Sequence, residues 1–191
     1  DNIDEIKGMD ISEEEVVVKR ILRPQDVFNL NGEEIEHDFA LITKGRKSQD
    51  LHVSNILIGD SSKLFIEEGA EIFCSSLNTT KGSIYVGKNA EIMEGSNVRG
   101  GLAMCEYSAL KLGTKVYGAT TLGPYTKVGG EVNNVVFLGY SNKGHDGFLG
   151  NAVIGEWCNL GSDTNSSNLK NNYTEVRIWS YVSNRFESTG L

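Results

Sequence analysis

The sequence predicts a mainly β protein with the architecture of a parallel β-helix, and three observations support this prediction. Apolar residues recur every six positions in the middle of the chain, as Leu110, Val116, Leu122 and Val128 do. On a strand, residues six apart share one face, whereas on an α-helix they would circle the axis. Turn-forming residues recur between them, and the 191 residues include 22 glycines. A short fixed repeat of this kind indicates a solenoid.

The six-residue spacing is found over most of residues 51–191. The further members of the series are Ile66 and Ile72; Val86, Ile92 and Val98; and Ile154 and Leu160. Three six-residue sides form one triangular coil, and the repeated apolar residue fills its interior. Similarity to hexapeptide-repeat proteins implies a left-handed sense, against the usual right-handed crossover rule. An antiparallel β-sandwich is the alternative, and four hexads in one register disfavour it.

Residues 1–50 lack the repeat and predict a short α/β segment. Residues 16–22 are rich in β-branched side chains, which favours a strand. A capping box at Ser12 and Glu15 would instead start a helix, and three consecutive valines disfavour that alternative.

Two helical pieces are expected next. Pro24 is placed to open a short helix, and Asn31-Gly32 is predicted to be a turn. Residues 33–43 place apolar side chains on one helical face, and residues 44–48 form a basic linker.

The repeat has two interruptions. Its register breaks between Val128 and Ile154, where residues 139–147 are polar and glycine-flanked and are predicted to leave the wall as a loop. A second polar break covers residues 162–173. Functional residues of solenoids are usually placed at such interruptions.

Composition limits the class of protein. The net charge of −8 argues against nucleic-acid binding, and no apolar run is long enough to cross a membrane. The chain opens with acidic residues instead of a basic signal sequence. Cys74, Cys105 and Cys158 are far apart and form no Cys-x-x-Cys motif, so we expect neither disulfides nor zinc, and a cytoplasmic location.

His145 is the sharpest candidate for chemistry. Glycines flank it at positions 144 and 147, and Asp146 or Glu131 is placed to orient its imidazole. A neutral imidazole is suited to remove a proton from an amine or hydroxyl. The alternative is a surface histidine without a role. A metal site is disfavoured because the other two histidines lie outside the regular coils.

Lysines and asparagines around the two interruptions form a second group of candidates. Lys143, Lys127 and Lys170 are able to bind phosphate, although any of them can equally be a solvated surface lysine. The segment after residue 158 is dense in asparagine, which indicates either αL corners or amides lining a sugar site. These asparagines are Asn159, Asn165, Asn168, Asn171 and Asn172.

Four motifs carry a family resemblance. They are Gly-Pro-Tyr at 123–125, Gly-Gly-Glu-Val-Asn-Asn at 129–134, Gly-Tyr-Ser-Asn-Lys-Gly-His-Asp-Gly-Phe-Leu-Gly at 139–150 and Ile-Gly-Glu-Trp-Cys-Asn-Leu-Gly at 154–161. Residues 143–168 resemble the acetyltransferase half of the bifunctional glucosamine-1-phosphate acetyltransferase / N-acetylglucosamine-1-phosphate uridylyltransferase family. The stretch from about residue 87 to residue 191 is more similar to shorter sugar nucleotidyltransferases related to that family.

The resemblance implies a role for each matching residue. His145 falls on the catalytic base, which removes a proton from the sugar amine that attacks acetyl-CoA. Phe148 falls on an aromatic residue that contacts sugar phosphate, although it lacks the hydroxyl group. Asn159 and Asn168 fall on substrate-binding asparagines, and Ser162 falls where the backbone contacts acetyl-CoA. Such sites lie between neighbouring subunits of a trimer.

The sequence departs from the family in two respects. The family's Arg and Lys that hold the sugar phosphate lie upstream of the histidine, and the nearest equivalents of the Lys here are Asn133 or Asn134. Lys127 or Arg99 are possible substitutes. The C-terminal coils that bind coenzyme A in the family have no counterpart in these residues.

These observations lead to two domains and one leading function. Residues 1–50 are expected to be the tail of a nucleotidyltransferase-like α/β domain, the only part for which the resemblance implies Mg²⁺. Residues 51–191 are expected to be an acyltransferase-like β-helix that transfers acetyl from acetyl-CoA to an amino sugar phosphate. The alternatives are a trimerisation or regulatory module of a sugar-1-phosphate nucleotidyltransferase, and a β-helix that only trimerises or binds a sugar.

Overall fold

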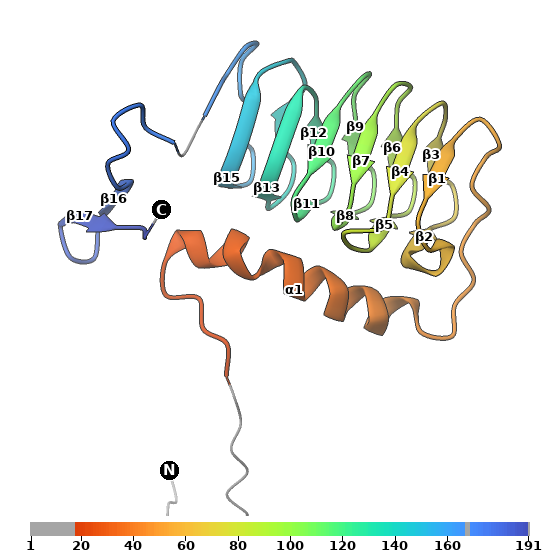
Figure 1. Ribbon diagram of the computed structural model, residues 1–191, viewed down its shortest axis with the longest axis horizontal. Coiled ribbons are helices and arrows are strands. Elements are labelled where there is room, and N and C mark those ends of the chain that lie inside the picture. Colours follow the sequence, from red (N-terminus) through yellow and green to blue (C-terminus); the bar gives the residue numbers. More distant parts are fainter. Residues whose placement is uncertain (1–17, 167–168, 191) are drawn as a thin grey trace, which may run out of the picture.

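The computed structural model describes residues 18–166 and 169–190. Its centre is a parallel β-helix of stacked coils, and one long helix lies along the stack (Figure 1). Strands of successive coils pair in parallel and in register, so Ile84 pairs with Leu102 and Leu102 with Thr120. This confirms the β-helix predicted from the six-residue repeat.

Three sides make up each coil. The first contains β1 (Ile56–Ile58), β4 (Ser76–Asn78), β7 (Asn97–Arg99), β10 (Lys115–Tyr117) and the first parts of β13 (Glu131–Phe137) and β15 (Phe148–Ile154). The second contains β2 (Leu64–Ile66), β5 (Ile84–Val86), β8 (Leu102–Met104), β11 (Thr120–Leu122) and the last parts of β13 and β15. The third contains β3 (Glu71–Ile72), β6 (Glu91–Ile92), β9 (Ala109–Leu110), β12 (Lys127–Val128) and β14 (Asn142–Lys143).

The core is the column of inward-facing apolar side chains inside this prism. Val98 and Val116 pair across β7 and β10, and both are almost completely buried. The other fully buried members of the six-residue series include Ile66, Val86, Ile92, Leu110, Leu122 and Val128. Successive coils place apolar residues above one another as far as Val128 on the third side, and burial of this column provides the main driving force for stacking.

A ladder of aromatic residues forms the corner between the second and third sides. Successive rings lie nearly parallel, with centroids 4.8, 5.5 and 5.0 Å apart. All four residues adopt the left-handed conformation that the tight corner requires. The ladder consists of Tyr107, Tyr125, Tyr140 and Trp157.

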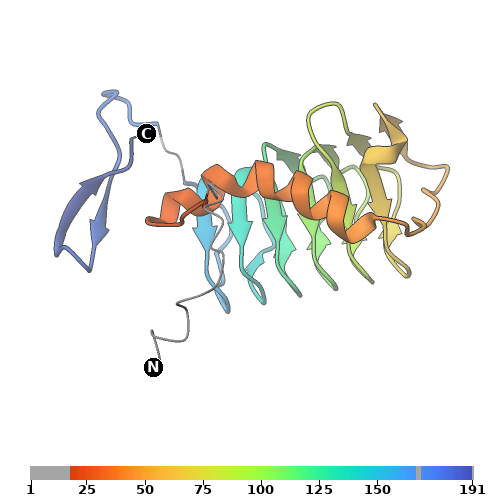
Figure 2. The ribbon, with the colours of Figure 1, turned by 90° about the horizontal axis from the view of Figure 1, so that it is seen from below.

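Helix α1 (Pro24–Thr43) packs along the second side of the prism, crossing its strands (Figures 1 and 2). The Asp26 carboxylate accepts hydrogen bonds from the backbone N–H groups of Leu22 and Arg23, which satisfies donors just ahead of the first turn. Phe28 and Ile35 are buried on the face that meets the coils. The Glu36 carboxylate accepts bonds of 2.6 and 2.8 Å from the Ser83 N–H and hydroxyl.

The predicted turn at Asn31-Gly32 is wrong, because α1 continues through both residues. Asn31 donates to the Ala119 carbonyl at 2.9 Å and accepts from the Thr121 hydroxyl at 2.7 Å. A Cβ on Gly32 would lie 3.3 Å from the Ala119 Cβ. Close approach to the coils, and not a chain reversal, therefore explains this dipeptide. The helix predicted for residues 33–43 is confirmed as the second half of α1.

The strand predicted for residues 16–22 is not present at residues 18–22, which form no regular element; residues 16 and 17 lie outside the described part. The predicted loop at 139–147 is also wrong. Residues 142 and 143 form β14 in the wall, and Tyr140 belongs to the aromatic ladder. The six-residue register breaks between Val128 and Ile154 because the corners between these coils are short. The coils themselves remain stacked, so the wall continues.

The parallel stacking ends shortly after the second predicted interruption begins. Ser166 still bridges to Leu149. Further on, β16 (Arg177–Ser180) and β17 (Arg185–Ser188) form an antiparallel hairpin beside the prism (Figure 1). The Arg23 guanidinium donates to the Ser188 carbonyl at 3.1 Å, which connects the hairpin to the start of α1. No helix in the described part of the chain is long and apolar enough to cross a membrane.

Candidate functional site

His145 lies in a four-residue corner that joins β14 on the third side to β15 on the first side of the next coil. Its side chain is exposed. The corresponding corner one coil earlier contains only Gly129 and Gly130, between β12 and β13. Cβ atoms on these glycines would lie 2.8 Å from the Gly144 and Gly147 carbonyl oxygens. The longer corner therefore packs its backbone directly over the shorter one and presents His145 at the edge of the prism.

Lys143 fixes this corner from the inside. It pairs with Val128 and occupies an inward position of the core column, with 1% of its surface exposed. Its Nζ donates to the carbonyl oxygens of Gly129, His145 and Gly147 at 2.9, 3.1 and 2.7 Å. Burial lowers the pKa of Lys143, and the nearby Asp146 carboxylate partly opposes this effect.

All three donors of the Lys143 ammonium group are used within the chain, so none is left for a substrate phosphate. The structure therefore shows Lys143 as a residue that positions the His145 corner. The sequence prediction placed Lys143 among the substrate-binding residues. The six-residue spacing did not predict that this lysine is buried in the core.

Ser162 lies at the same corner one coil further on. Asn142 bridges in parallel to Asn159, which sets the register of the two coils. The Asp163 N–H then donates to the Asp146 carbonyl at 3.1 Å. His145 directly precedes Asp146, and Ser162 directly precedes Asp163. The stacking of the two corners therefore places His145 and Ser162 in neighbouring coils at the same edge. The residues expected to act on the amine and on acetyl-CoA are thus neighbours.

Phe148 and Asn159 lie on different sides of the prism. Phe148 begins β15 and lies on the outer face of the first side, where a Cβ on Gly150 would meet its ring at 2.7 Å. Asn159 is exposed on the third side and accepts a bond of 2.9 Å from the Asn142 amide. The two faces meet at the corner that carries His145. One protomer therefore does not enclose a ligand between Phe148 and Asn159.

Neither carboxylate proposed to orient the imidazole does so within residues 18–166 and 169–190. Glu131 instead accepts a hydrogen bond from the Tyr117 hydroxyl, on the outer face of the first side. This bond, together with burial and the charge of Glu131, raises the pKa of Tyr117. Asp146 forms a stacked corner with Asp163 through its carbonyl group. The His145 imidazole is therefore left open to solvent.

The remaining candidates are distributed around the prism. Asn133 lies between Tyr117 and Gly150 in the stack of first-side strands. Asn134 and Asn151 form an amide ladder at a corner, with a bond of 2.8 Å and positive φ at both residues. Arg99 lies two coils before the His145 corner.

The amide of Asn165 accepts the Phe148 N–H at 2.7 Å and donates to the Asp163 carbonyl at 2.8 Å. Asn168 lies outside the described residues, so its predicted role at the substrate site stays a prediction. Cys74, Cys105 and Cys158 are free thiols. No cluster of three or more potential metal ligands occurs among residues 18–166 and 169–190.

Comparison with protein-family models and with curated proteins finds no match to this chain.

Proposed function

We propose that this protein transfers the acetyl group of acetyl-CoA to the amine of an amino sugar phosphate, with His145 as general base. The observation that carries the proposal is the stacked corner: an exposed His145 held by the buried Lys143, with Ser162 beside it in the next coil. A fixed backbone with an open imidazole is suited to proton transfer.

The chemistry needs only one proton acceptor. The neutral imidazole accepts a proton from the sugar amine as its nitrogen attacks the thioester carbonyl. The new C–N bond forms, the C–S bond breaks, and the CoA thiolate leaves and recovers a proton from the imidazolium. The products are an N-acetyl sugar phosphate and free CoA.

The separation of Phe148 and Asn159 supports a site shared between copies of the chain. The two residues flank His145 on different faces, so a neighbouring protomer is needed to close the site around a ligand. A homotrimer is the expected assembly.

The left-handed sense of the β-helix and the cytoplasmic location of the protein also stay predictions.

The test measures acetyl transfer with glucosamine-1-phosphate as the probe acceptor. Acetylated product and free CoA should be quantified by chromatography, because Cys74 is exposed and would react with a thiol reagent. His145→Ala should lower the rate by about 100-fold or more. The matched control is His37→Ala, an exposed histidine on α1 far from the corner. Undiminished transfer in folded His145→Ala would refute the proposal.

A second candidate is a non-catalytic β-helix that trimerises or regulates a sugar-1-phosphate nucleotidyltransferase. The lack of a carboxylate that orients the His145 imidazole, in the described part of the chain, favours this candidate. It predicts that acetyl-CoA titrated into the protein gives no saturable binding signal. Saturable binding that Ser162→Pro abolishes would instead favour the acetyltransferase.

A further inference from the structure

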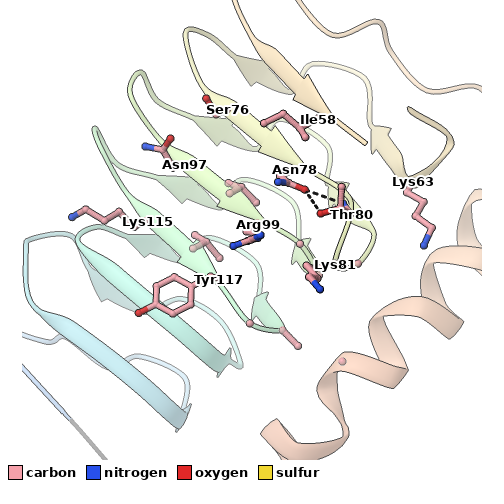
Figure 3. Close-up of a pocket in the computed structure, with 18 of the residues that line it drawn as sticks. Ile58, Lys63, Ser76, Asn78, Thr80, Lys81, Asn97, Arg99, Lys115 and Tyr117 are labelled. Carbon is pink, nitrogen blue, oxygen red and sulfur yellow. Dashed lines mark hydrogen bonds between the residues drawn. The ribbon is translucent and has the colours of Figure 1, made fainter. Parts of the chain in front are cut away.

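A large groove lies between α1 and the outer face of the first side, well before the His145 corner. Its volume is about 1130 Å³, and its wall is formed by β1, β4, β7 and β10 (Figure 3). Tyr117 from β10 lies at one end of the groove, and the exposed Ile58 from β1 lies at the other. Residues Gly32 and Glu36 of α1 form the opposite wall.

Four cationic side chains line this groove. Lys63 ends the short 3₁₀ helix η2 (Ser61–Lys63), Lys81 lies between β4 and β5, and Arg99 ends β7. These three belong to consecutive coils and lie near the corner that faces α1, whereas Lys115 of β10 lies farther from the helix (Figure 3). All four side chains are exposed.

Lys81, Arg99 and Lys115 form no ion pair in the part of the chain that the structure describes, whereas Lys63 interacts with the Asp60 carboxylate at the start of η2. The ion pairs found there involve Lys19, Arg46 and Arg185. Among residues 18–166 and 169–190, Glu36 is the only carboxylate that lines the groove, and both of its oxygens accept hydrogen bonds from Ser83. A concentration of unpaired positive charge is unexpected in a chain with a net charge of −8. Mutual repulsion of the cations is relieved when an anion binds between them.

We propose that this groove binds an organic diphosphate of the nucleoside diphosphate class. Lys63, Lys81 and Arg99 come from three consecutive coils and line the same groove, so they offer separate cationic groups to the two phosphates of one ligand. Arg99 lies in the middle of the groove and presents a planar fork of N–H donors suited to phosphate oxygens.

The size and lining of the groove point to an organic diphosphate in preference to inorganic phosphate. The volume is slightly larger than the roughly 300–1,000 Å³ typical of small-molecule sites, so the groove has room for an organic diphosphate. Beyond the cations, the Tyr117 ring is available to the organic part of the ligand, and so is the amide oxygen of Asn97, whose amide nitrogen donates to the Gly95 carbonyl. The site is separate from the His145 corner, so this proposal does not depend on acetyl transfer.

The test is isothermal titration of the full chain with uridine diphosphate and adenosine diphosphate as probes, and with inorganic phosphate at the same ionic strength. Saturable binding of a nucleoside diphosphate is expected. Arg99→Ala should weaken it by about tenfold, and Lys81→Ala combined with Lys63→Ala by a similar factor. The side chains of these residues are exposed and make no hydrogen bonds in the described part of the chain, so the variants should fold.

Two control variants make the result specific. Lys88→Ala removes an exposed lysine from the opposite edge of the prism and should leave the affinity unchanged. His145→Ala should also leave it unchanged, which separates this site from acetyl transfer. The proposal is overturned by absence of saturable binding, by equal losses in Arg99→Ala and Lys88→Ala, or by tighter binding of a single-stranded oligonucleotide.

Discussion

Lys143 is a charged residue in a column of apolar side chains. In the coil before it the same position is Val128, and Lys143 replaces the apolar contact with three bonds to carbonyl oxygens. A buried ammonium group is tolerated only when its donors are satisfied. The free-energy cost of burying the Lys143 ammonium group is therefore offset only while the His145 corner and Gly129 keep the three carbonyl oxygens in place.

Replacing this lysine should destabilise the protein in a pH-dependent way. Lys143→Met fills the space but leaves the carbonyl groups without their donor, which should lower the free energy of unfolding by about 2–4 kcal/mol at pH 7. Burial lowers the pKa of Lys143 below 10.5, so the folded state loses this proton before the unfolded state does. Wild-type stability due to this group therefore rises as the pH passes through the lowered folded-state pKa towards the unfolded value of 10.5.

Urea unfolding of both proteins at pH 7 and pH 9.5 measures this effect. The stability difference between wild type and Lys143→Met should grow with pH. Lys127→Met, which changes an exposed lysine on the neighbouring strand, should show no such trend. A difference that shrinks with pH would contradict the assigned burial.

At the residue scale, sequence reasoning singled out His145 and Ser162 at two interruptions of the repeat, but it expected residues 139–147 to leave the wall as a loop. The structure instead places His145 in a corner of the continuing wall, and the roles of both residues stay predictions. It did not distinguish Lys143, whose spacing from Val128 is 15 residues instead of 18 and therefore breaks the simple repeat. It named Arg99 as a candidate phosphate ligand but did not group it with Lys63 and Lys81. The first-side strands of these coils are offset by 20 and 21 residues, so the six-residue repeat does not relate the three cations.

Among the secondary-structure elements, α1 is held to the coils by polar contacts as well as by its apolar face. Asn31 is buried and forms hydrogen bonds with two residues of the coils. One is Ala119, which lies between β10 and β11, and the other is Thr121 in β11. Removing the amide leaves a buried carbonyl and a hydroxyl without partners. Asn31, which the sequence pattern assigned to a turn, is therefore one of the residues that dock the helix, together with Glu36 and the buried Phe28 and Ile35.

Asn31→Ala should lower stability by about 1–3 kcal/mol and loosen α1 more than the coils. Hydrogen exchange measured by mass spectrometry should show faster exchange in residues 24–43, with little change in β8. Asp38→Ala, an exposed position on the same helix, serves as the control. Equal acceleration in α1 and β8 would show that the helix and the coils unfold together, against this expectation.

The strands were the most predictable elements, because a six-residue period places every repeated side chain on one face. The corners were less so. The aromatic ladder follows positive-φ corners at Tyr107, Tyr125 and Tyr140, whose spacing changes from 18 to 15 residues as the coils shorten. Because this spacing is irregular, the ladder was not predicted from the sequence. An aromatic residue followed by Ser or Thr nevertheless recurs at each of these corners.

For the whole molecule, the prism separates two possible sites along one outer face. The groove of Lys63, Lys81 and Arg99 lies in the early coils, and the His145 corner lies in the late coils. Outward residues of β7, β10, β13 and β15 connect them, with Arg99, Tyr117 and Asn133 in one register row. A rigid solenoid holds such sites at a fixed distance, so each can be tested without the other.

The arrangement of Phe148 and Asn159 on different faces leads to a prediction about assembly. If a neighbouring protomer closes the site, His145 and Asn159 act from different chains. His145→Ala and Asn159→Ala should each lose acetyl transfer alone, but mixed trimers formed by co-expression should regain on the order of a quarter of wild-type activity, because random assembly restores that share of sites. Light scattering should give three times the 20.9 kDa chain mass. Trimers that regain no activity on mixing would place both residues in one protomer, and a monomeric mass would exclude the shared site altogether.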